Sequence, residues 1–206
     1  MRTLVIESAT EACSAALFED DELVAGAYEI LGRGHAERLV PMISELPGKG
    51  LAARVAVSLG PGSFTGVRIG LAAARALGLA WKVPVLGYPT LAIVAAMARR
   101  SHPGPVTVCM TGGHGEWFIQ NYRADGLPAE NLVSLAPSDA IGHRGFQVVA
   151  GSQAKAKAVS EDAGTIALDI LPDARAFSLL PEVLLSRDLS PIYGRPPDAR
   201  KPAERG

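Results

Sequence analysis

The sequence lacks the excess of positive charge that proteins gripping nucleic acid usually carry. It has 20 lysine and arginine residues against 21 aspartate and glutamate residues, which gives a net charge of −1. Direct binding to a phosphate backbone is therefore not expected. No apolar run has membrane length, and no signal peptide is recognised at the N-terminus. We expect a cytoplasmic protein that neither spans a membrane nor binds nucleic acid by itself.

Cysteine and histidine are also scarce, which limits the possible metal, disulfide and catalytic chemistry. Cys13 and Cys109 each lie in an apolar run with β-type neighbours, so we expect two buried thiols and not a disulfide. The four histidines are scattered singly along the chain. Their spacing assigns neither a metal-ligand pair nor a partner for a catalytic serine. We therefore predict no metal site and no catalytic residue.

The chain has enough apolar residues to form a core. Hydrophobic residues make up 48% of the sequence and charged residues 20%, which excludes a disordered or collagen-like chain. A length of 206 residues suits one large domain or two small lobes. The stretch SHPGP, residues 101–105, is the strongest cluster of helix and strand breakers. We predict a first lobe over residues 1–101, a smaller lobe over 102–190 and an extended tail over 191–206.

Apolar periodicity predicts an α/β fold. Three short apolar bursts separated by polar turns predict an antiparallel meander at residues 4–6, 13–18 and 23–28. Helical spacing and breakers then predict helices at 35–46 (bent near Pro41), 65–81 and 90–100, alternating with strands at 54–60 and 83–87. The second half predicts strands at 106–110, 116–122 and 146–151, and helices at 152–162 and 173–185.

The glycine-rich stretch SLGPGSFTGVRIGLAAARALGLA, residues 58–80, invites comparison with phosphate-binding loops. Gly60, Gly62 and Gly66 have neither the P-loop nor the dinucleotide spacing, and the P-loop lysine is absent. One alternative is an anion site at the N-terminus of the following helix, with Arg68 one turn inside. The other is a helix whose small residues allow close packing on two sides. Arg68 and Arg75 then share a side of that helix.

Polar residues after the first predicted strand are the remaining candidates for chemistry. Glu7 stands where phosphate-handling folds often place a carboxylate for a metal ion, whereas the neighbouring hydroxyls suit a turn that caps backbone groups. Ser63 does not fit the G-x-S-x-G pattern of a nucleophile. The weak candidates for binding a nucleotide are Glu7, Thr10, Gly62 and Ser63, and we assign no cofactor.

Five stretches of the chain together resemble one family. They are LVIESATEACSAAL, GRGHAERLVPMI, LGPGSFTGVRIGLAAARALGLA, VPVLGYPTLAIVA and, near the end, SPIYGR with Pro191, Tyr193 and Arg195. These stretches resemble the bacterial TsaB proteins, also called YeaZ, of tRNA threonylcarbamoyladenosine synthesis. The resemblance implies an α/β fold of two RNase H-like lobes of the actin-like ATPase superfamily, with mixed sheets flanked by helices.

The resemblance also implies a function and its partners. It implies a non-catalytic subunit that binds a catalytic TsaD-like paralogue and, with a TsaE-like ATPase, supports threonylcarbamoyl transfer to N6 of the adenosine 3′ to the anticodon. Contact with tRNA would be indirect, and the isolated chain could form a homodimer. The alternative is a free-standing enzyme, either a degenerate kinase-like ATPase or a glycoprotease, in which Glu7, Thr10 and the glycine loop bind nucleotide.

Helices at residues 35–46 and 65–81 are the predicted partner interface, forming a four-helix contact with the paralogue. The residues predicted to lie in it are His35, Arg38, Leu39, Met42, Ile43, Arg68, Leu71, Ala72, Arg75 and Leu79. The sequence departs from the family at Glu7, where aspartate is usual, and at the turn TGGHG. Residues 88–93 also lack the histidine pair that binds metal in the catalytic paralogue.

Overall fold

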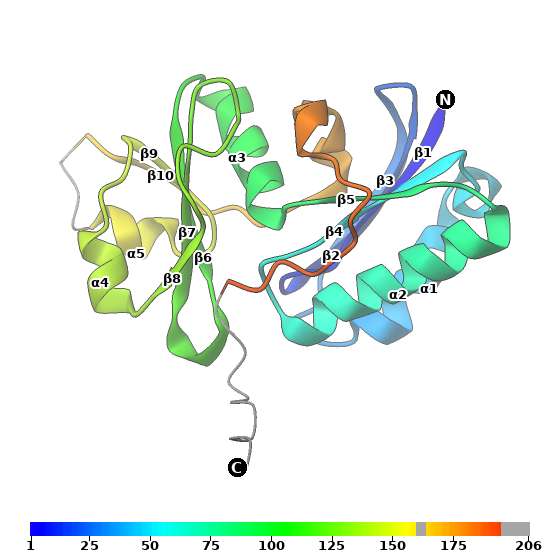
Figure 1. The fold of residues 1–206 in the computed structure, drawn as a ribbon, viewed down its shortest axis with the longest axis horizontal. Coiled ribbons are helices and arrows are strands. Elements are labelled where there is room, and N and C mark those ends of the chain that lie inside the picture. The colour runs from blue at the N-terminus through cyan, green and yellow to red at the C-terminus, as the bar shows by residue number, and fades with distance from the viewer. Residues whose placement is uncertain (160–163, 195–206) are drawn as a thin grey trace, which may run out of the picture.

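The computed structural model describes residues 1–159 and 164–194. Within these residues the chain forms two five-stranded mixed sheets, one at each end of the molecule (Figure 1). The first has the order β3-β2-β1-β4-β5, with β1 (Arg2–Glu7), β2 (Ala12–Glu19), β3 (Glu22–Ile30), β4 (Arg54–Ser58) and β5 (Val85–Tyr88). The second has the order β10-β9-β6-β7-β8, with β6 (Val106–Thr111), β7 (Trp117–Tyr122), β8 (Val133–Leu135), β9 (Val148–Ala150) and β10 (Ile166–Leu168).

Helices and short 3₁₀ turns connect these strands. The α-helices are α1 (His35–Glu45), α2 (Phe64–Trp81), α3 (Thr90–Ser101), α4 (Pro137–Gly142) and α5 (Ala154–Ala158). The 3₁₀ turns are η1 (Pro47–Gly50), η2 (Gly113–Gly115), η3 (Ala174–Leu179) and η4 (Glu182–Leu184). None of the helices in the described ranges combines the length and hydropathy needed to cross a bilayer.

The two halves repeat one topology. In each half the first strand pairs antiparallel with the second and parallel with the fourth, the second pairs antiparallel with the third, and the fourth pairs parallel with the fifth. The strands β6 to β10 therefore correspond in order to β1 to β5. This confirms the predicted α/β class with two mixed sheets flanked by helices.

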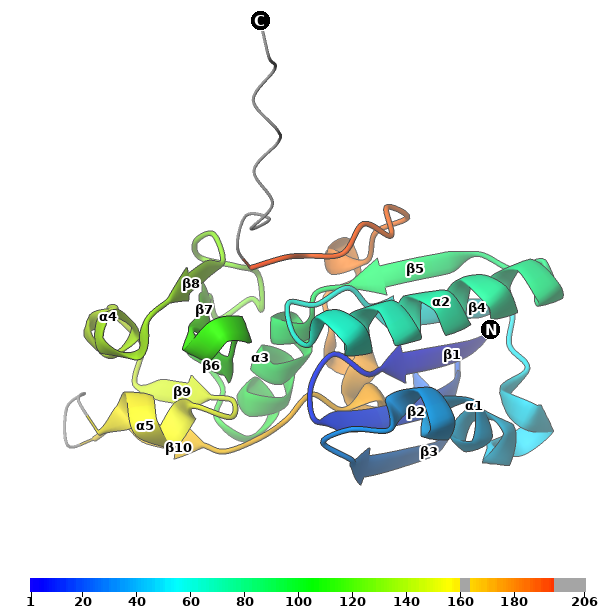
Figure 2. The ribbon, with the colours of Figure 1, turned by 90° about the horizontal axis from the view of Figure 1, so that it is seen from below.

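The segments that follow β5 and β10 each cross to the opposite sheet. Helix α3 follows β5, but Leu91, Val94 and Ala98 on it pack against the core of the second sheet. The turn η3 follows β10, but Phe177 on it packs in the first half against Phe18 and Tyr88, with ring centroids 5.9 Å and 5.7 Å apart. Helix α3 and η3 lie between the sheets (Figure 2). The limits predicted for the lobes stay a prediction.

Most predicted elements of the first half are confirmed, with α1 continuing through Pro41. The helix predicted over residues 173–185 is wrong, because this segment forms η3 and η4 separated by extended backbone at Leu180 and Pro181. A proline disfavours helical backbone at the residue before it and cannot donate to a helical carbonyl. Of the helix predicted at 152–162, only α5 is helical, and residues 160–163 lie outside the described part of the chain.

The first core fills the space between the first sheet and helices α1 and α2. Leu4 and Ile6 of β1 contact it from the sheet, and Leu39, Met42 and Leu71 contact it from the two helices. Both helices thus cover one face of the sheet and turn their other face outward (Figure 1). Cys13 and Cys109 are buried free thiols, as predicted.

A Lys157→Met variant is expected to be less stable by about 2–3 kcal/mol, because two carbonyl groups at the end of α4 lose their charged donor. Lys157 is fully buried, and its Nζ donates to the carbonyl of Ile141 (3.1 Å) and of His143 (2.7 Å) at the end of α4. Chemical denaturation measures the loss. Lys155→Met on the same helix is the control, because the Lys155 side chain is 74% exposed and forms a surface ion pair with Asp169. Equal stability of both variants would contradict this role.

Candidate functional site

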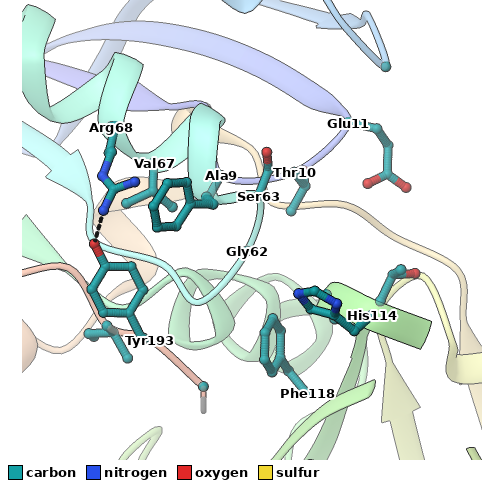
Figure 3. A pocket seen from close by; sticks show the side chains of 17 residues that line it. Ala9, Thr10, Glu11, Gly62, Ser63, Val67, Arg68, His114, Phe118 and Tyr193 are labelled. Atoms are coloured by element: carbon teal, nitrogen blue, oxygen red, sulfur yellow. Dashed lines mark hydrogen bonds between the residues drawn. The ribbon is translucent and has the colours of Figure 1, made fainter. Parts of the chain in front are cut away.

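A cleft of about 720 Å³ opens between the two halves (Figure 3). Five segments converge on it: the β1–β2 turn, the β3–α1 loop at Gly32, the loop before α2 with the start of that helix, the β6–β7 turn with its TGGHG sequence, and the segment after residue 191. The lining residues are Ala9, Thr10, Glu11, Gly32, Gly62, Ser63, Phe64, Val67, Arg68, Thr111, Gly112, Gly113, His114, Phe118, Ile192, Tyr193 and Gly194. Its volume is in the range of small-molecule sites.

Three of the four weak nucleotide candidates reach this cleft, and the hydroxyl groups of two of them already form hydrogen bonds that stabilise the fold. Thr10, Gly62 and Ser63 line it. The Thr10 Oγ1 accepts from the N–H of Ala12 (3.2 Å), and the Ser63 Oγ accepts from the N–H of Gly66 (3.2 Å). Ser63 is thus the N-cap of α2. The interpretation of this region as a turn whose hydroxyls cap backbone groups is supported at both positions.

Glu7, the fourth candidate, does not line the cleft. It lies at the end of β1, fully buried, and its Oε1 accepts from the N–H of Ala9 (2.8 Å). Ser58 and Tyr88 lie beside this carboxyl and lower its pKa in part, although within the described chain neither the Oε2 of Glu7 nor the Oγ of Ser58 has a partner at hydrogen-bond geometry. Burial raises the pKa of Glu7 from 4.5 to about 7, and the Ala9 N–H opposes this only in part. The carboxyl is therefore largely protonated below neutral pH.

The glycines of the opening loop are explained by close approach of backbone segments. A Cβ on Gly62 would overlap the carbonyl oxygen of Ala9, and one on Gly66 would overlap the carbonyl oxygen of Ser8. The N–H of Ser63 also donates to the Ala9 carbonyl (2.6 Å). Only glycine leaves room for the β1–β2 turn to pack on the start of α2. Of the two alternatives for this loop, close packing is the one that these contacts support.

Sequence reasoning missed an aromatic cluster at the mouth of the cleft. The Arg68 guanidinium lies 3.2 Å from the centre of the Phe64 ring and donates to the Tyr193 hydroxyl (2.9 Å). The rings of Phe64 and Tyr193 are 6.0 Å apart. The only signal in the sequence was the match at SPIYGR, which could not place Tyr193 beside α2. Arg195, from the same stretch, lies outside the described residues.

Nine of the ten predicted interface residues divide into two sets by their exposure. Four of them, Arg68, Ala72, Arg75 and Leu79, lie on the exposed outer face of α2, and Leu79 is 82% exposed. The other apolar residues and the histidine are buried within the chain: His35, Leu39, Met42, Ile43 and Leu71. A partner cannot touch these five without unfolding of the first half, so the accessible surface is narrower than the predicted set.

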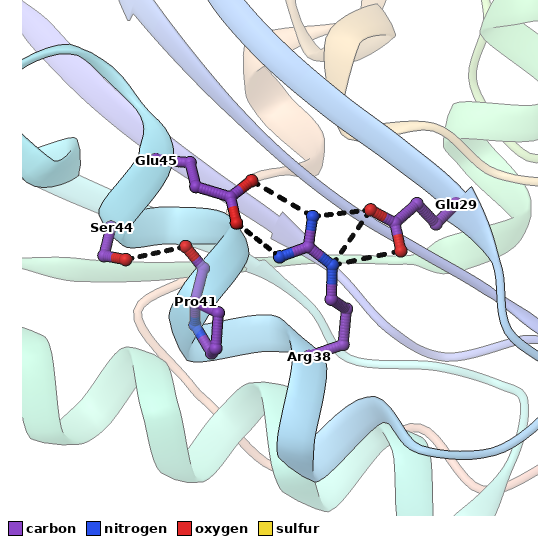
Figure 4. Close-up of polar contacts among 5 residues, drawn as sticks. All are labelled: Glu29, Arg38, Pro41, Ser44 and Glu45. Carbon is purple, nitrogen blue, oxygen red and sulfur yellow. Dashed lines mark hydrogen bonds and ion pairs between the residues drawn. The ribbon is translucent and has the colours of Figure 1, made fainter.

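Arg38, the remaining predicted interface residue, forms ion pairs with two carboxylates of its own chain (Figure 4). Its guanidinium donates to Glu29 of β3 (2.6 Å) and to Glu45 at the end of α1 (2.7 Å). These hydrogen bonds lower the pKa of both carboxyl groups. Arg38 thus ties α1 to the edge of the first sheet, and its charge is already neutralised.

No group of three or more histidine, cysteine, aspartate or glutamate side chains in residues 1–159 and 164–194 is arranged to hold a metal ion. Two other features stand out: a cleft with few charged side chains, and an outer helix face with exposed apolar residues and arginines.

Residues 29–159 match the family model described as TsaD, tRNA N6-adenosine threonylcarbamoyltransferase. The chain is also 30% identical to the solved structure of YeaZ from Pseudomonas aeruginosa, with a TM-score of 0.73, and the match covers 86% of this chain and 89% of that one. The chain belongs to the TsaB (YeaZ) family. The resemblance seen in the sequence is therefore confirmed.

Curated relatives carry the name tRNA threonylcarbamoyladenosine biosynthesis protein TsaB. That of Escherichia coli (strain K12) is 37% identical over 131 residues, covering 61% of this chain and 56% of the relative. That of Bacillus subtilis (strain 168) is 30% identical over 138 residues, covering 65% and 60%. The match thus spans less than two thirds of either TsaB relative. Ethanolamine utilization protein EutJ from Carboxydothermus hydrogenoformans, at 11% identity and a TM-score of 0.50, shares the fold alone.

Proposed function

We propose that this TsaB-family protein is a non-catalytic subunit of tRNA threonylcarbamoyladenosine synthesis. It supports threonylcarbamoyl transfer to N6 of the adenosine 3′ to the anticodon by binding a catalytic TsaD-like protein through the outer faces of α1 and α2. A TsaE-like ATPase acts in the same complex, and tRNA is contacted by the partners. The names of the relatives support the pathway. The observation that carries the binding role is the exposed face of α2.

That face combines small residues with two large apolar side chains, Phe64 and Leu79. Ala72 and Ala76 are exposed and let a partner helix approach closely. Leu79 exposes 82% of its surface, and Val40 on the adjoining α1 exposes 61%. Large apolar side chains this exposed on neighbouring helices are typical of an interaction surface. A TsaD-like partner that shares the fold would present an equivalent helix pair, giving a four-helix contact.

We expect Leu79→Arg and Ala72→Arg each to weaken binding of the host's purified TsaD-like protein by about 30-fold or more. Both residues are exposed, so the variants should keep the wild-type thermal unfolding temperature. Val183→Arg is the matched control, because Val183 is 74% exposed but lies in η4. Isothermal titration calorimetry measures the affinities, and a tRNA-modification assay with and without this protein tests the role in the pathway.

The outcomes separate the proposal from its alternatives. Absence of binding by the wild-type chain, or full modification activity without it, would contradict the proposal. Dimerisation of the free chain that Leu79→Arg abolishes, with partner binding intact, would assign the α2 face to a homodimer.

The cleft supports a second candidate function, nucleotide binding by a free-standing degenerate ATPase. The observation in its favour is that Thr10, Gly62 and Ser63 line a cavity of about 720 Å³. The buried carboxyl of Glu7 weighs against it, because this carboxyl does not line the cleft and burial raises its pKa to about 7, which disfavours the charged form that a magnesium ion needs. Calorimetry with ATP and magnesium distinguishes the two: micromolar binding by the isolated chain would favour this candidate.

A further inference from the structure

Residues 186–193, which we call the strap, run from η4 past β5 toward the mouth of the cleft (Figure 2). Ser186 and Gly87 of β5 exchange two backbone hydrogen bonds (2.8 and 2.9 Å). Farther on, the N–H of Ile192 donates to the carbonyl of Leu59 (2.8 Å). The strap therefore covers part of the otherwise open edge of the first sheet, and it delivers Tyr193 to the start of α2.

Two arginines on the outer face of α2 hold the strap. The Arg75 guanidinium donates to the carbonyl of Leu189 (3.1 Å), and the Arg68 guanidinium donates to the hydroxyl of Tyr193 (2.9 Å). Both acceptors are neutral. Within residues 1–159 and 164–194, neither guanidinium has a carboxylate partner. The arginines thus connect the strap to α2, so that the two form one continuous surface. No carboxylate of the described residues neutralises their positive charges.

The cluster of Phe64, Arg68 and Tyr193 at one end of this surface is unusually exposed for aromatic side chains. Phe64 is 60% exposed and Tyr193 is 48% exposed. The Arg68 guanidinium lies over the Phe64 ring, 3.2 Å from its centre, and 5.8 Å from the centre of the Tyr193 ring. Aromatic rings and arginine are the side chains enriched at the energetic centres of protein interfaces. The mutual stacking also preorganises them, which lowers the entropy cost of binding.

The charge of this surface indicates the chemistry of its partner. Helix α2 contains Arg68 and Arg75 and no acidic residue, and the strap adds Arg187 and Asp188. These side chains together carry a net charge of +2, although the whole chain carries a net charge of −1. A partner surface with carboxylates facing these arginines would form charge-assisted hydrogen bonds. The small exposed residues between the arginines, Ala72 and Ala76, leave room for a helix to carry those carboxylates.

We propose that the strap and the outer face of α2 form a single docking surface for an acidic segment of the catalytic partner, with Phe64, Arg68 and Tyr193 at its energetic centre. This rests on the proposed function, which it extends in two ways. It makes a C-terminal segment part of the interface, and it assigns carboxylates to the partner's side.

The test measures binding of the full-length chain to the TsaD-like protein at several salt concentrations. Phe64→Ala and Tyr193→Ala are each expected to weaken binding about 30-fold. Tyr193→Phe keeps the ring and should lose about twofold to fivefold. Arg68→Gln should weaken binding and reduce its dependence on salt. Val183→Ala, at an exposed residue outside the surface, should bind like the wild type.

The results distinguish this inference from the proposed function. Failure of the wild-type chain to bind the partner would overturn both. Loss of binding in Leu79→Arg together with wild-type affinity in Phe64→Ala and Tyr193→Ala would overturn only the docking surface described here. If the affinity of Arg68→Gln depended on salt as strongly as that of the wild type, the proposed acidic character of the partner segment would be contradicted. If these variants lost only self-association and still bound the partner, the occupant of the surface would be a second copy of this chain. That result would also contradict the proposal.

Discussion

A Glu7→Gln variant is expected to keep nearly constant stability between pH 5 and pH 8, whereas the wild-type protein loses about 3 kcal/mol as the pH rises through this range. The cause is the buried carboxyl, whose pKa is about 7 in the folded chain against an ordinary value of 4.5. Between these two values the folded state binds the proton and the unfolded state has released it. Stability therefore falls as the pH rises from about 4.5 and levels off above the folded pKa of about 7.

The comparison of the two proteins isolates Glu7 from other titrating groups. Glutamine has nearly the same shape and stays neutral, so Glu7→Gln should be more stable than the wild type at pH 8 and similar to it at pH 5. Urea denaturation at each pH measures this. Glu22→Gln, at an exposed residue, should retain the wild-type pH dependence. If the wild type and Glu7→Gln lost stability in parallel between pH 5 and pH 8, the raised pKa of the Glu7 carboxyl would be contradicted.

The second large effect is expected at the glycine loop. Gly66→Ala should destabilise the protein by about 3 kcal/mol or more, or prevent it from folding. A Cβ at this position would overlap the carbonyl oxygen of Ser8, which belongs to the β1–β2 turn. The direction of the change in stability is informative, because Gly66 lies in the first turn of α2. Alanine in an unobstructed helix is more favourable than glycine by about 1 kcal/mol, so helix propensity alone predicts the opposite result.

Two other glycines provide graded controls for Gly66→Ala. Gly78→Ala, farther along the same helix, would press mainly on the side chain of Val85, which can move more easily than backbone, so a smaller loss is expected. Gly113 lines the cleft, and a Cβ added there would have no heavy atom within 4 Å. Gly113→Ala should therefore leave stability unchanged. Equal stability of Gly66→Ala and Gly113→Ala in thermal unfolding would contradict the packing explanation of the motif.

These expectations assign the polar and glycine-rich residues near the cleft to the architecture of the first half. Ser63 caps α2, Gly62 and Gly66 admit the β1–β2 turn, and Glu7 is sealed beneath that turn. The proposed function accordingly rests on the surface of α2 and the strap. Nucleotide binding in the cleft stays the alternative function, and calorimetry with ATP and magnesium tests it.

Local patterns in the sequence determined the elements of the first half and the family. The meander, α1, α2 and α3 were predictable because each has its own hydrophobic period and its own breakers at the ends. The stretch GPGSFTG could be recognised because packing of backbone against backbone permits few residue types. The fold class followed from the order of these elements.

Only the tertiary structure decided which residues of those elements are accessible. Helical spacing places Leu39, Met42 and Ile43 on one face of α1, but only the position of the sheet decides that this face is the core. The segment 173–185 was misjudged because Pro181 interrupts it, and because Phe177 packs on Phe18 and Tyr88, which are distant in sequence. Tyr193 likewise meets Arg68 across 125 positions of the chain. Burial and pairing of this kind depend on how the two halves exchange their crossing segments, which no local pattern encodes.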